Sequence, residues 1–301
     1  MRDERGRMKK SNPLPVTGSR GSESDVHSSS FTSHHSKRRF GQNFLVDQTI
    51  AERIVNAVQP KAGETIVEIG PGRGALTGKL LKHAERVVAI EFDRDLVPQL
   101  RTTFSNDTKL ELIEADALDV DFCEVIQPSP AARVVANLPY NIATAILQRL
   151  IEQRRCISDM TLMLQREVVD RITAAAGAGE RGYLSVFVQA YCEPEILFDV
   201  APQAFRPVPK VWSTVLRLRV RPRIAADVKD EALLWKVVSA GFAQRRKTIL
   251  NNLRDAPEEI QELLKRRGGA SIVLCDAGIP PLRRAETFEL EEWALLVNAL
   301  F

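Results

Sequence analysis

The strongest constraint on the fold is a short β-branched run that leads into a glycine-rich turn. The run Thr65–Ile69 is followed by Gly70-Pro71-Gly72-Arg73-Gly74 and then by a helical pattern from Ala75 to Ala84. Strand, glycine turn and helix in this order open a nucleotide-binding unit, because glycine lets the backbone approach a ligand where a Cβ would clash. Alternating strand and helix patterns continue to about Ile151, which predicts a doubly wound, mostly parallel α/β sheet.

Acidic residues follow the next two predicted strands. Glu91 ends the strand that begins at Arg86 and lies about twenty positions beyond Gly70, the spacing at which a carboxylate accepts ribose hydroxyls. The strand Leu110–Glu114 leads to Asp116, which is placed where an adenine amino group would bind. A nicotinamide cofactor fits these features equally well, so a dinucleotide-dependent oxidoreductase is an open alternative at this point.

A motif after the fourth predicted strand separates these two classes. Asn137-Leu138-Pro139-Tyr140 follows the apolar run 133–136. The side-chain carbonyl of Asn137 and the backbone carbonyl of Leu138 can accept both protons of an exocyclic amine, while Tyr140 stacks on the base. Such acceptors free the nitrogen lone pair for attack without a strong general base. Group transfer to an amine explains this motif, whereas hydride transfer leaves it without a role.

With these residues in place, the chain resembles the ribosomal RNA adenine dimethyltransferases, most closely the small-subunit (16S) enzymes of the KsgA type. The shared motifs run in family order from about residue 37 to the C-terminus: Phe40-Gly41-Gln42-Asn43-Phe44-Leu45, Glu68-Ile69-Gly70-Pro71-Gly72, Glu91-Phe92-Asp93-Arg94-Asp95, Asp116-Ala117-Leu118, Asn137-Leu138-Pro139-Tyr140, Leu164-Gln165-Arg166-Glu167-Val168, Phe205-Arg206-Pro207-Val208-Pro209-Lys210-Val211, Gln244-Arg245-Arg246-Lys247-Thr248 and Arg284-Ala285-Glu286-Thr287.

The resemblance implies a Rossmann-like methyltransferase fold, S-adenosyl-L-methionine as the cofactor, and dimethylation of the N6 amines of two adjacent adenosines in small-subunit rRNA during ribosome assembly. It implies that the cofactor site contains Asn43, Leu45, Gly70, Glu91, Asp116 and Asn137. It also implies that the catalytic residues are Asn137, Leu138, Tyr140 and Phe205, with Tyr140 and Phe205 stacking on the target adenine. No metal is expected.

Charge is distributed unevenly along the chain, whose net charge is +3. Residues 206–254 contain twelve Lys/Arg and three Asp/Glu, a local net charge of +9 that is typical of a phosphate-binding surface. The basic run Arg245-Arg246-Lys247 falls in what reads as a helical stretch, so we expect some of its side chains to contact rRNA. Lys37, Arg38 and Arg39 form a second candidate RNA anchor.

The predicted domains are a Ser-rich, basic and disordered tail (1–36), a catalytic domain (37–221) and a small all-helical rRNA-binding domain (222–301) with helices near 229–243, 246–253, 258–268 and 287–300. Later strands are expected at 160–165, 195–200 and 213–220, the last two as an antiparallel hairpin.

Four scattered cysteines are interpreted as free thiols in a reducing compartment: Cys123, Cys156, Cys192 and Cys275. The sequence has no apolar stretch long enough to span a membrane and no signal-peptide pattern, so we expect a cytoplasmic protein. The resemblance implies that it acts on the small ribosomal subunit, and we expect it to be a monomer.

Two alternatives remain beside the oxidoreductase. One is a methyltransferase of large-subunit rRNA that confers macrolide resistance, against which the long C-terminal region with Arg245 and Arg284 argues. The other is a non-catalytic ribosome assembly factor, against which the intact Glu91, Asp116 and Asn137 argue.

Overall fold

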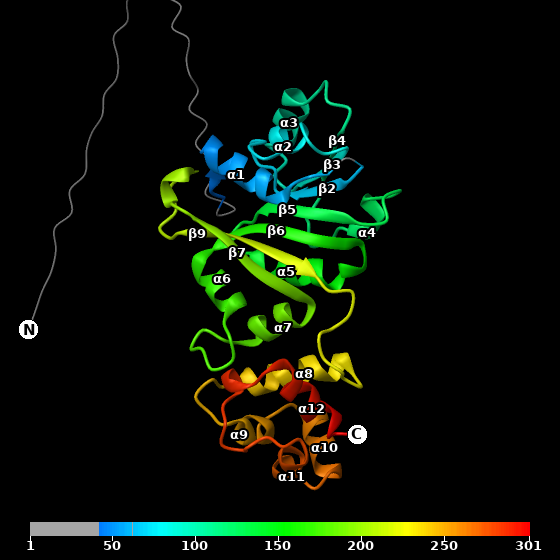
Figure 1. Ribbon diagram of the computed structural model, residues 1–301, viewed down its shortest axis with the longest axis vertical. Helices are drawn as coiled ribbons and strands as arrows, with labels where there is room; N and C mark the ends of the chain where they lie inside the picture. Colours follow the sequence, from blue (N-terminus) through cyan, green and yellow to red (C-terminus); the bar gives the residue numbers. More distant parts are fainter. Residues whose placement is uncertain (1–41, 62) are drawn as a thin grey trace, which may run out of the picture. The chain divides into compact units, whose positions relative to one another are not determined.

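The computed structural model describes residues 42–61 and 63–301, which belong to the compact unit Arg38–Phe301 (Figure 1). The predicted sites Lys37, Arg38 and Arg39 lie outside the described residues. Within the described residues, every element after the last strand is helical, and no helix has the length and apolar character needed to cross a membrane. The predicted domain boundary at residue 222 remains a prediction.

A seven-stranded sheet has the order β4-β3-β2-β5-β6-β9-β7. The strands are β2 (Thr65–Ile69), β3 (Arg86–Glu91), β4 (Leu110–Glu114), β5 (Ala132–Asn137), β6 (Ile157–Gln165), β7 (Cys192–Val200) and β9 (Ser213–Val220). The pairs among β4, β3, β2, β5 and β6 are parallel, and β9 is antiparallel to both β6 and β7. The predicted mostly parallel α/β fold is therefore confirmed. The chain order reverses between β2 and β5, and ligands bind at such a switch point in open α/β sheets.

A second, two-stranded sheet pairs β1 (Phe44–Leu45) with β8 (Phe205–Arg206) in antiparallel register, so that Leu45 faces Phe205. Segments far apart in the sequence thus meet beside the main sheet. Helix α1 (Gln48–Val58) begins shortly after β1. Asp47 caps it, because its carboxylate accepts the backbone N–H groups of Thr49 at 2.8 Å and Ile50 at 3.1 Å.

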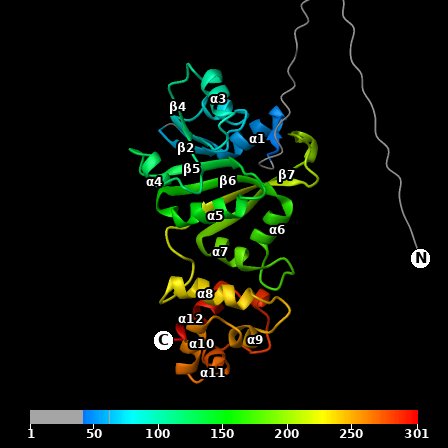
Figure 2. The same cartoon turned by 180° about the vertical axis from the view of Figure 1, so that it is seen from behind.

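Successive residues of a strand point to opposite faces of the sheet, so β2 contributes side chains to two apolar cores. Ile66 packs with α1 and α2 (Thr77–Leu80) on one face, while Val67 and Ile69 belong to a larger core on the other. The larger core is covered by α5 (Ala143–Glu152), α6 (Arg166–Thr173) and α7 (Tyr183–Tyr191), which lie together on one face in Figure 2. Shorter elements are α3 (Val97–Thr103), α4 (Phe122–Val125), η2 (Arg154–Cys156) and η3 (Pro202–Ala204).

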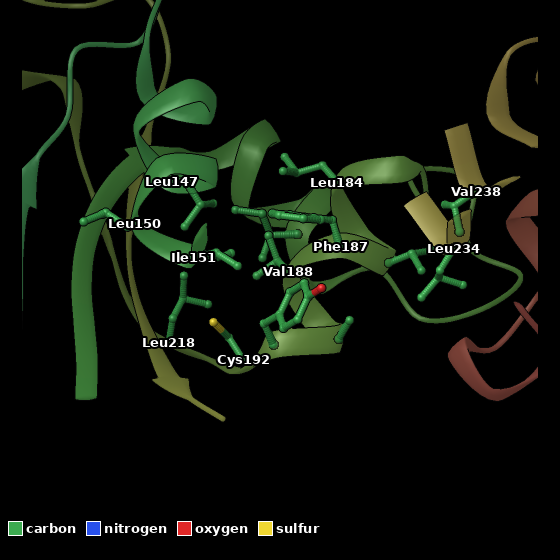
Figure 3. Close-up of a cluster of buried hydrophobic side chains, with 14 of the residues drawn as sticks. Leu147, Leu150, Ile151, Leu184, Phe187, Val188, Cys192, Leu218, Leu234 and Val238 are labelled. Carbon is green, nitrogen blue, oxygen red and sulfur yellow. The ribbon is translucent and has the colours of Figure 1, made fainter. Parts of the chain in front are cut away.

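The C-terminal helices are α8 (Glu231–Phe242), α9 (Ile249–Arg254), α10 (Glu258–Arg266), α11 (Ala270–Asp276) and α12 (Leu290–Asn298), with a 3-10 turn η4 (Ala285–Thr287) before the last. The larger apolar core continues from α5 through α7 into α8. Leu147, Phe187 and Leu234 mark this path in Figure 3. The sequence pattern missed α11.

Two expectations about local structure were wrong. Residues 244–247 are not helical: they form the turn between α8 and α9, with the Lys247 N–H donating to the Gln244 carbonyl at 3.0 Å. The chain leaves the helix at Phe242, and Thr248 caps the next one by accepting from the Asn251 N–H at 3.4 Å. The basic run is therefore on a loop.

The expectation of four free thiols was also wrong, because Cys123 and Cys156 form a disulfide across 33 residues of sequence. Gln153 explains their proximity. Its side chain accepts the Phe122 N–H at 2.7 Å and donates to the Val120 carbonyl at 2.9 Å, which ties α4 to η2. Cys192 and Cys275 are free thiols. The sequence could not show this pairing because it depends on the packing of two distant segments.

Candidate active site

A pocket lies at the carboxyl ends of the parallel strands, at the switch point between β2 and β5. Its empty volume, including the part open to solvent, is about 1020 Å³. The walls come from the segment before α1 and from the ends of β2, β3, β4 and β5. The lining residues are Gln42, Asn43, Phe44, Ile69, Gly70, Gly72, Ile90, Glu91, Phe92, Ala115, Asp116, Ala117, Asn137, Leu138, Pro139, Tyr140, Asn141, Ile142 and Ile146.

The glycine turn after β2 adopts a backbone that other residues rarely tolerate. Gly70 has φ +67° and Gly72 has φ +59°. A Cβ at Gly72 would lie 3.1 Å from Cδ1 of Phe44, so the turn and β1 are in close contact. Gly70 lines the pocket, and a Cβ added to it would meet no atom within 4 Å. The turn therefore leaves open space at Gly70 that a bound group can occupy.

Glu91 ends β3 with only 3% of its surface exposed. Its Oε2 accepts the Gly72 N–H at 3.0 Å, and its Oε1 accepts the Asp93 N–H at 2.8 Å. Burial raises the pKa of this carboxyl, and hydrogen bonds from the backbone N–H groups of Asp93, Gly72 and Phe92 oppose that rise. A carboxylate has about four acceptor positions, so Glu91 retains capacity to accept from a ribose hydroxyl.

Asp116 and Phe92 provide two groups suited to an adenine ring: a carboxylate that can accept from its amino group and an apolar face that can stack on the ring. Oδ1 of Asp116 accepts the Leu118 N–H at 2.9 Å, and this local bond fixes the carboxylate at the pocket wall. Phe92 also lines the pocket and is 54% exposed, so an apolar face lies at the same site. The acidic residue was predicted from its place after β4; the aromatic one was not.

Asn137 is oriented by a residue from the start of the described chain. Its Nδ2 donates to the backbone carbonyl of Asn43 at 3.1 Å. Since the amide nitrogen is engaged there, Oδ1 is left as the acceptor that the Asn-Leu-Pro-Tyr motif requires. Asn137 is half-buried at the pocket, so this oxygen acts in a partly desolvated site.

Tyr140 is held at its hydroxyl end. The Tyr140 hydroxyl is 2.8 Å from Oγ of Ser213, which is fully buried at the start of β9. Burial raises the pKa of Tyr140 and the bond to Ser213 opposes that rise, so the phenol is neutral near pH 7. The ring is half-buried and lines the pocket, which leaves part of it for contact with a base.

Glu68 is a buried acidic residue that sequence reasoning did not assign to the site. It lies near the end of β2 with 1% of its surface exposed, and its Oε2 has no hydrogen-bond partner among the described residues. Burial raises its pKa to about 7, and repulsion from Glu91 acts in the same direction. A glutamate within an apolar β-branched run was the available signal.

Two of the predicted site residues lie outside this pocket. Leu45 is 6% exposed and Phe205 is fully buried, and both pack in the smaller apolar core around α1. Their backbones pair across β1 and β8, which explains why their side chains turn inward. A base cannot stack on Phe205 in this conformation. Leu45 instead borders a neighbouring hollow with Arg73 and Lys79.

The predicted RNA-binding cations are not equally available. Arg246 is exposed, whereas Lys247 pairs with Asp255 at 2.8 Å. The Arg245 guanidinium donates to the backbone carbonyl of Gly179, in the loop between α6 and α7. On the sheet, Arg217 and Arg219 both pair with Glu195, at 3.4 and 2.7 Å, and Arg221 pairs with Glu193 at 3.0 Å. Much of the positive charge of 206–254 is thus already neutralised within the protein.

Comparison with known proteins agrees with this geometry. The family described as "Ribosomal RNA adenine dimethylase" matches residues 33–294. The Legionella pneumophila protein "Ribosomal RNA small subunit methyltransferase A" is 49% identical over 268 residues, which cover 88% of this chain and 98% of the relative. The Hahella chejuensis protein of the same name is 48% identical over 221 residues, covering 73% of this chain and 81% of the relative.

Two solved structures share the fold. The 23S rRNA methyltransferase ErmE matches with a TM-score of 0.64 at 27% identity, covering 86% of this chain and 99% of that one. A dimethyladenosine transferase from Plasmodium falciparum matches with a TM-score of 0.70 at 22% identity, covering 84% and 95%. The predicted Rossmann-like methyltransferase fold and the use of S-adenosyl-L-methionine are confirmed, and the oxidoreductase alternative is set aside. This chain belongs to the ribosomal RNA adenine dimethylase family.

Proposed function

We propose that this enzyme transfers methyl groups from S-adenosyl-L-methionine to the N6 amines of two adjacent adenosines in a 3′-terminal hairpin loop of small-subunit (16S) rRNA. The product is N6,N6-dimethyladenosine. The observation that carries the proposal is the amide of Asn137, whose nitrogen is held by Asn43 at 3.1 Å so that its oxygen serves as an acceptor beside Tyr140. The names of the small-subunit relatives support the same substrate.

The residues present suit the cofactor. Glu91 would bind the ribose hydroxyls, Asp116 the adenine amino group, and Phe92 one face of the adenine ring. The open space at Gly70 would let the backbone approach the rest of the molecule closely. Asn43 lines the same pocket, and its backbone carbonyl accepts from the Asn137 amide, which links the cofactor site to the residue that would orient the amine. When bound, S-adenosyl-L-methionine supplies an electrophilic methyl group.

The protein's part in the reaction is to position the amine. The Asn137 side-chain carbonyl and the Leu138 backbone carbonyl accept the two amine protons, which directs the nitrogen lone pair toward the methyl group. Tyr140 holds the base by stacking, an interaction worth roughly 1–3 kcal/mol per base. The amine nitrogen would form the new bond to the methyl carbon while the bond from that carbon to sulfur breaks. S-adenosylhomocysteine would leave, and the surplus proton of the amine would pass to solvent. Orientation of this kind accounts for catalysis without a strong base.

A second methylation requires no change in the protein. Asn137 is neutral before and after the first transfer, so the same acceptor serves the monomethylated amine through its remaining proton. A carboxylate at this position would attract the proton that must leave. The neutral amide thus fits a site that works twice on one nitrogen.

The rRNA must present an unstacked adenosine, because the amine of a stacked base cannot enter the pocket. We propose that the helical region 222–301 binds the rRNA backbone through the exposed loop that contains Arg246, with Arg245 and Lys247 in support. Lys37, Arg38 and Arg39 would form a second anchor. We further propose that the enzyme acts as a cytoplasmic monomer on the small ribosomal subunit.

The deciding experiment is transfer of tritiated methyl groups from S-adenosyl-L-methionine to immature small subunits, followed by mapping of the modified bases. We expect label on two adjacent adenosines of the small-subunit rRNA, and much less label with Asn137→Ala. Label on large-subunit rRNA would favour the macrolide-resistance type of enzyme. Binding to small subunits without any transfer would favour an assembly factor.

A further inference from the structure

We propose that Trp212 stacks on the nucleobase next to the adenosine in the pocket, forming a second base-binding position at the mouth of the site. This inference rests on the proposed function, since it needs a single strand of rRNA to lie across the pocket.

Trp212 is an aromatic residue with a large exposed surface. The exposed fraction of Trp212 is 49%, whereas Trp293 is fully buried. Trp235 is half-buried, and its indole N–H donates to the Tyr191 hydroxyl at 2.8 Å. A large aromatic ring that is exposed to solvent beside a functional site indicates a binding role, because burying its apolar surface against a partner is favourable.

The position of Trp212 is fixed by the same strand that holds Tyr140. Its neighbour Ser213 is fully buried and lies 2.8 Å from the Tyr140 hydroxyl. The backbone carbonyl of Trp212 accepts the Arg166 N–H at 3.0 Å, which ties it to the start of α6. Ser213 pairs with Gln165 at the carboxyl end of β6, the strand next to β5, so Trp212 lies at the same edge of the sheet as the pocket. A base that stacks on Trp212 would therefore have a defined position relative to the pocket.

The surroundings of Trp212 suit a nucleic-acid strand. The loop before it exposes Val208 and Val211, by 51% and 37%, together with Arg206 and Lys210. Arg166 is also more than half exposed, although it pairs with Asp199 at 3.3 Å. An aromatic platform among cations is the arrangement by which proteins hold single strands, since the ring stacks on a base while the cations contact phosphates.

The two positions together match two adjacent adenosines. While one base occupies the pocket at Tyr140, its neighbour on the strand must lie just outside the mouth. Trp212 offers that neighbour a stacking surface and would keep the strand from sliding. The residue thus acts in positioning and register, and takes no part in the methyl transfer itself.

Tryptophan fluorescence tests this directly. The probe is an RNA hairpin with two adjacent adenosines in its loop, titrated into the full-length protein with S-adenosylhomocysteine present. We expect the emission to be quenched on binding, and the quenching to be lost in Trp212→Phe. Trp235→Phe is the matched control and should keep the quenching, because Trp235 lies in the core between α7 and α8.

Affinity gives a second measurement. Trp212→Ala should weaken hairpin binding roughly 5- to 150-fold, the range set by the loss of one base–aromatic stack, and Trp212→Phe should weaken it less. Cofactor affinity should be unchanged in both variants. Quenching that persists in Trp212→Phe, or Trp212→Ala binding as tightly as the wild type, would overturn the inference. Failure of the wild type to methylate small subunits would instead refute the proposed function.

Discussion

Gly72 and Glu91 are joined by a hydrogen bond of 3.0 Å from the backbone N–H of the glycine to Oε2 of the carboxylate. This bond links the glycine turn after β2 to the end of β3. One carboxylate thus both shapes the turn and faces the pocket, so the geometry of the turn and the affinity for the cofactor depend on the same side chain.

Glu91→Ala should weaken binding of S-adenosyl-L-methionine by about 1.5–3 kcal/mol, the usual value of hydrogen bonds to a charged group. Titration calorimetry measures this. Glu114→Ala is the matched control, because Glu114 pairs with Glu91 in register on β4 but its side chain is 40% exposed and pairs with Arg94. Equal affinities for the wild type and Glu91→Ala would remove Glu91 from the cofactor site.

Gly70→Ala, compared with a second glycine variant, distinguishes the effect of backbone strain on stability from the effect of a new Cβ in the pocket on cofactor binding. Alanine at φ +67° costs roughly 1–2 kcal/mol of stability, and the new Cβ would also enter the open space of the pocket. Gly177→Ala is the control: its φ is +88° and its Cβ also meets nothing within 4 Å, but it lies in the loop between α6 and α7. Both variants should lose similar stability in denaturant titrations, while only Gly70→Ala should lose cofactor affinity. Matching cofactor affinities would show that this space is not used.

Asn137→Ala should reduce methyl transfer far more than it reduces RNA affinity, because the lost amide oxygen orients the amine and does not anchor the strand. Single-turnover transfer and filter binding on immature small subunits measure the two effects. Asn106→Ala, an exposed change in the loop after α3 and away from the pocket lining, serves as the control. A parallel fall in transfer and binding would make Asn137 an RNA anchor.

Glu68 predicts a pH dependence of stability. Its pKa rises from an ordinary 4.5 to about 7 on folding, so the native state keeps a proton that the unfolded chain has lost. The free energy of unfolding should therefore fall by about 3 kcal/mol between pH 4.5 and pH 7 and then level off. Glu68→Gln should match the wild type near pH 4.5 and exceed its stability by a similar amount above pH 7.

Urea titrations at several pH values would measure the Glu68 effect, with Glu262→Gln on the exposed side of α10 as the control. Parallel stability curves for the wild type and Glu68→Gln would show that Glu68 is ionised in the native protein.

Neutralising the loop between α8 and α9 should flatten the salt dependence of rRNA binding. Each phosphate contact changes the slope of log K against log salt by roughly 0.7 to 0.9. Arg246→Ala should have a larger effect than Lys247→Ala, because Lys247 already pairs with Asp255 at 2.8 Å. Lys265→Ala, an exposed change on α10, is the control. An unaltered slope in the triple variant of Arg245, Arg246 and Lys247 would shift the anchor to Lys37–Arg39.

The sequence by itself determined the architecture and the chemistry of the pocket walls. The strand Thr65–Ile69, the turn at Gly70 and Gly72, and the acidic residues after β3 and β4 could be read directly. Each depends on short-range features: β-branched runs, a backbone that only glycine adopts readily, and a polar residue at a strand end. Parallel strands then bring such ends together at one edge of the sheet, whatever the loops between them contain.

Only the tertiary structure decided which side chains reach that edge. Leu45 and Phe205 turn inward because β1 pairs with β8, and Asn137 is oriented by the distant Asn43 carbonyl. The Cys123–Cys156 disulfide and the exposed Trp212 were equally hidden. In each case the outcome depends on segments that are far apart in the chain, and local patterns contain no information about which distant partner a residue will meet.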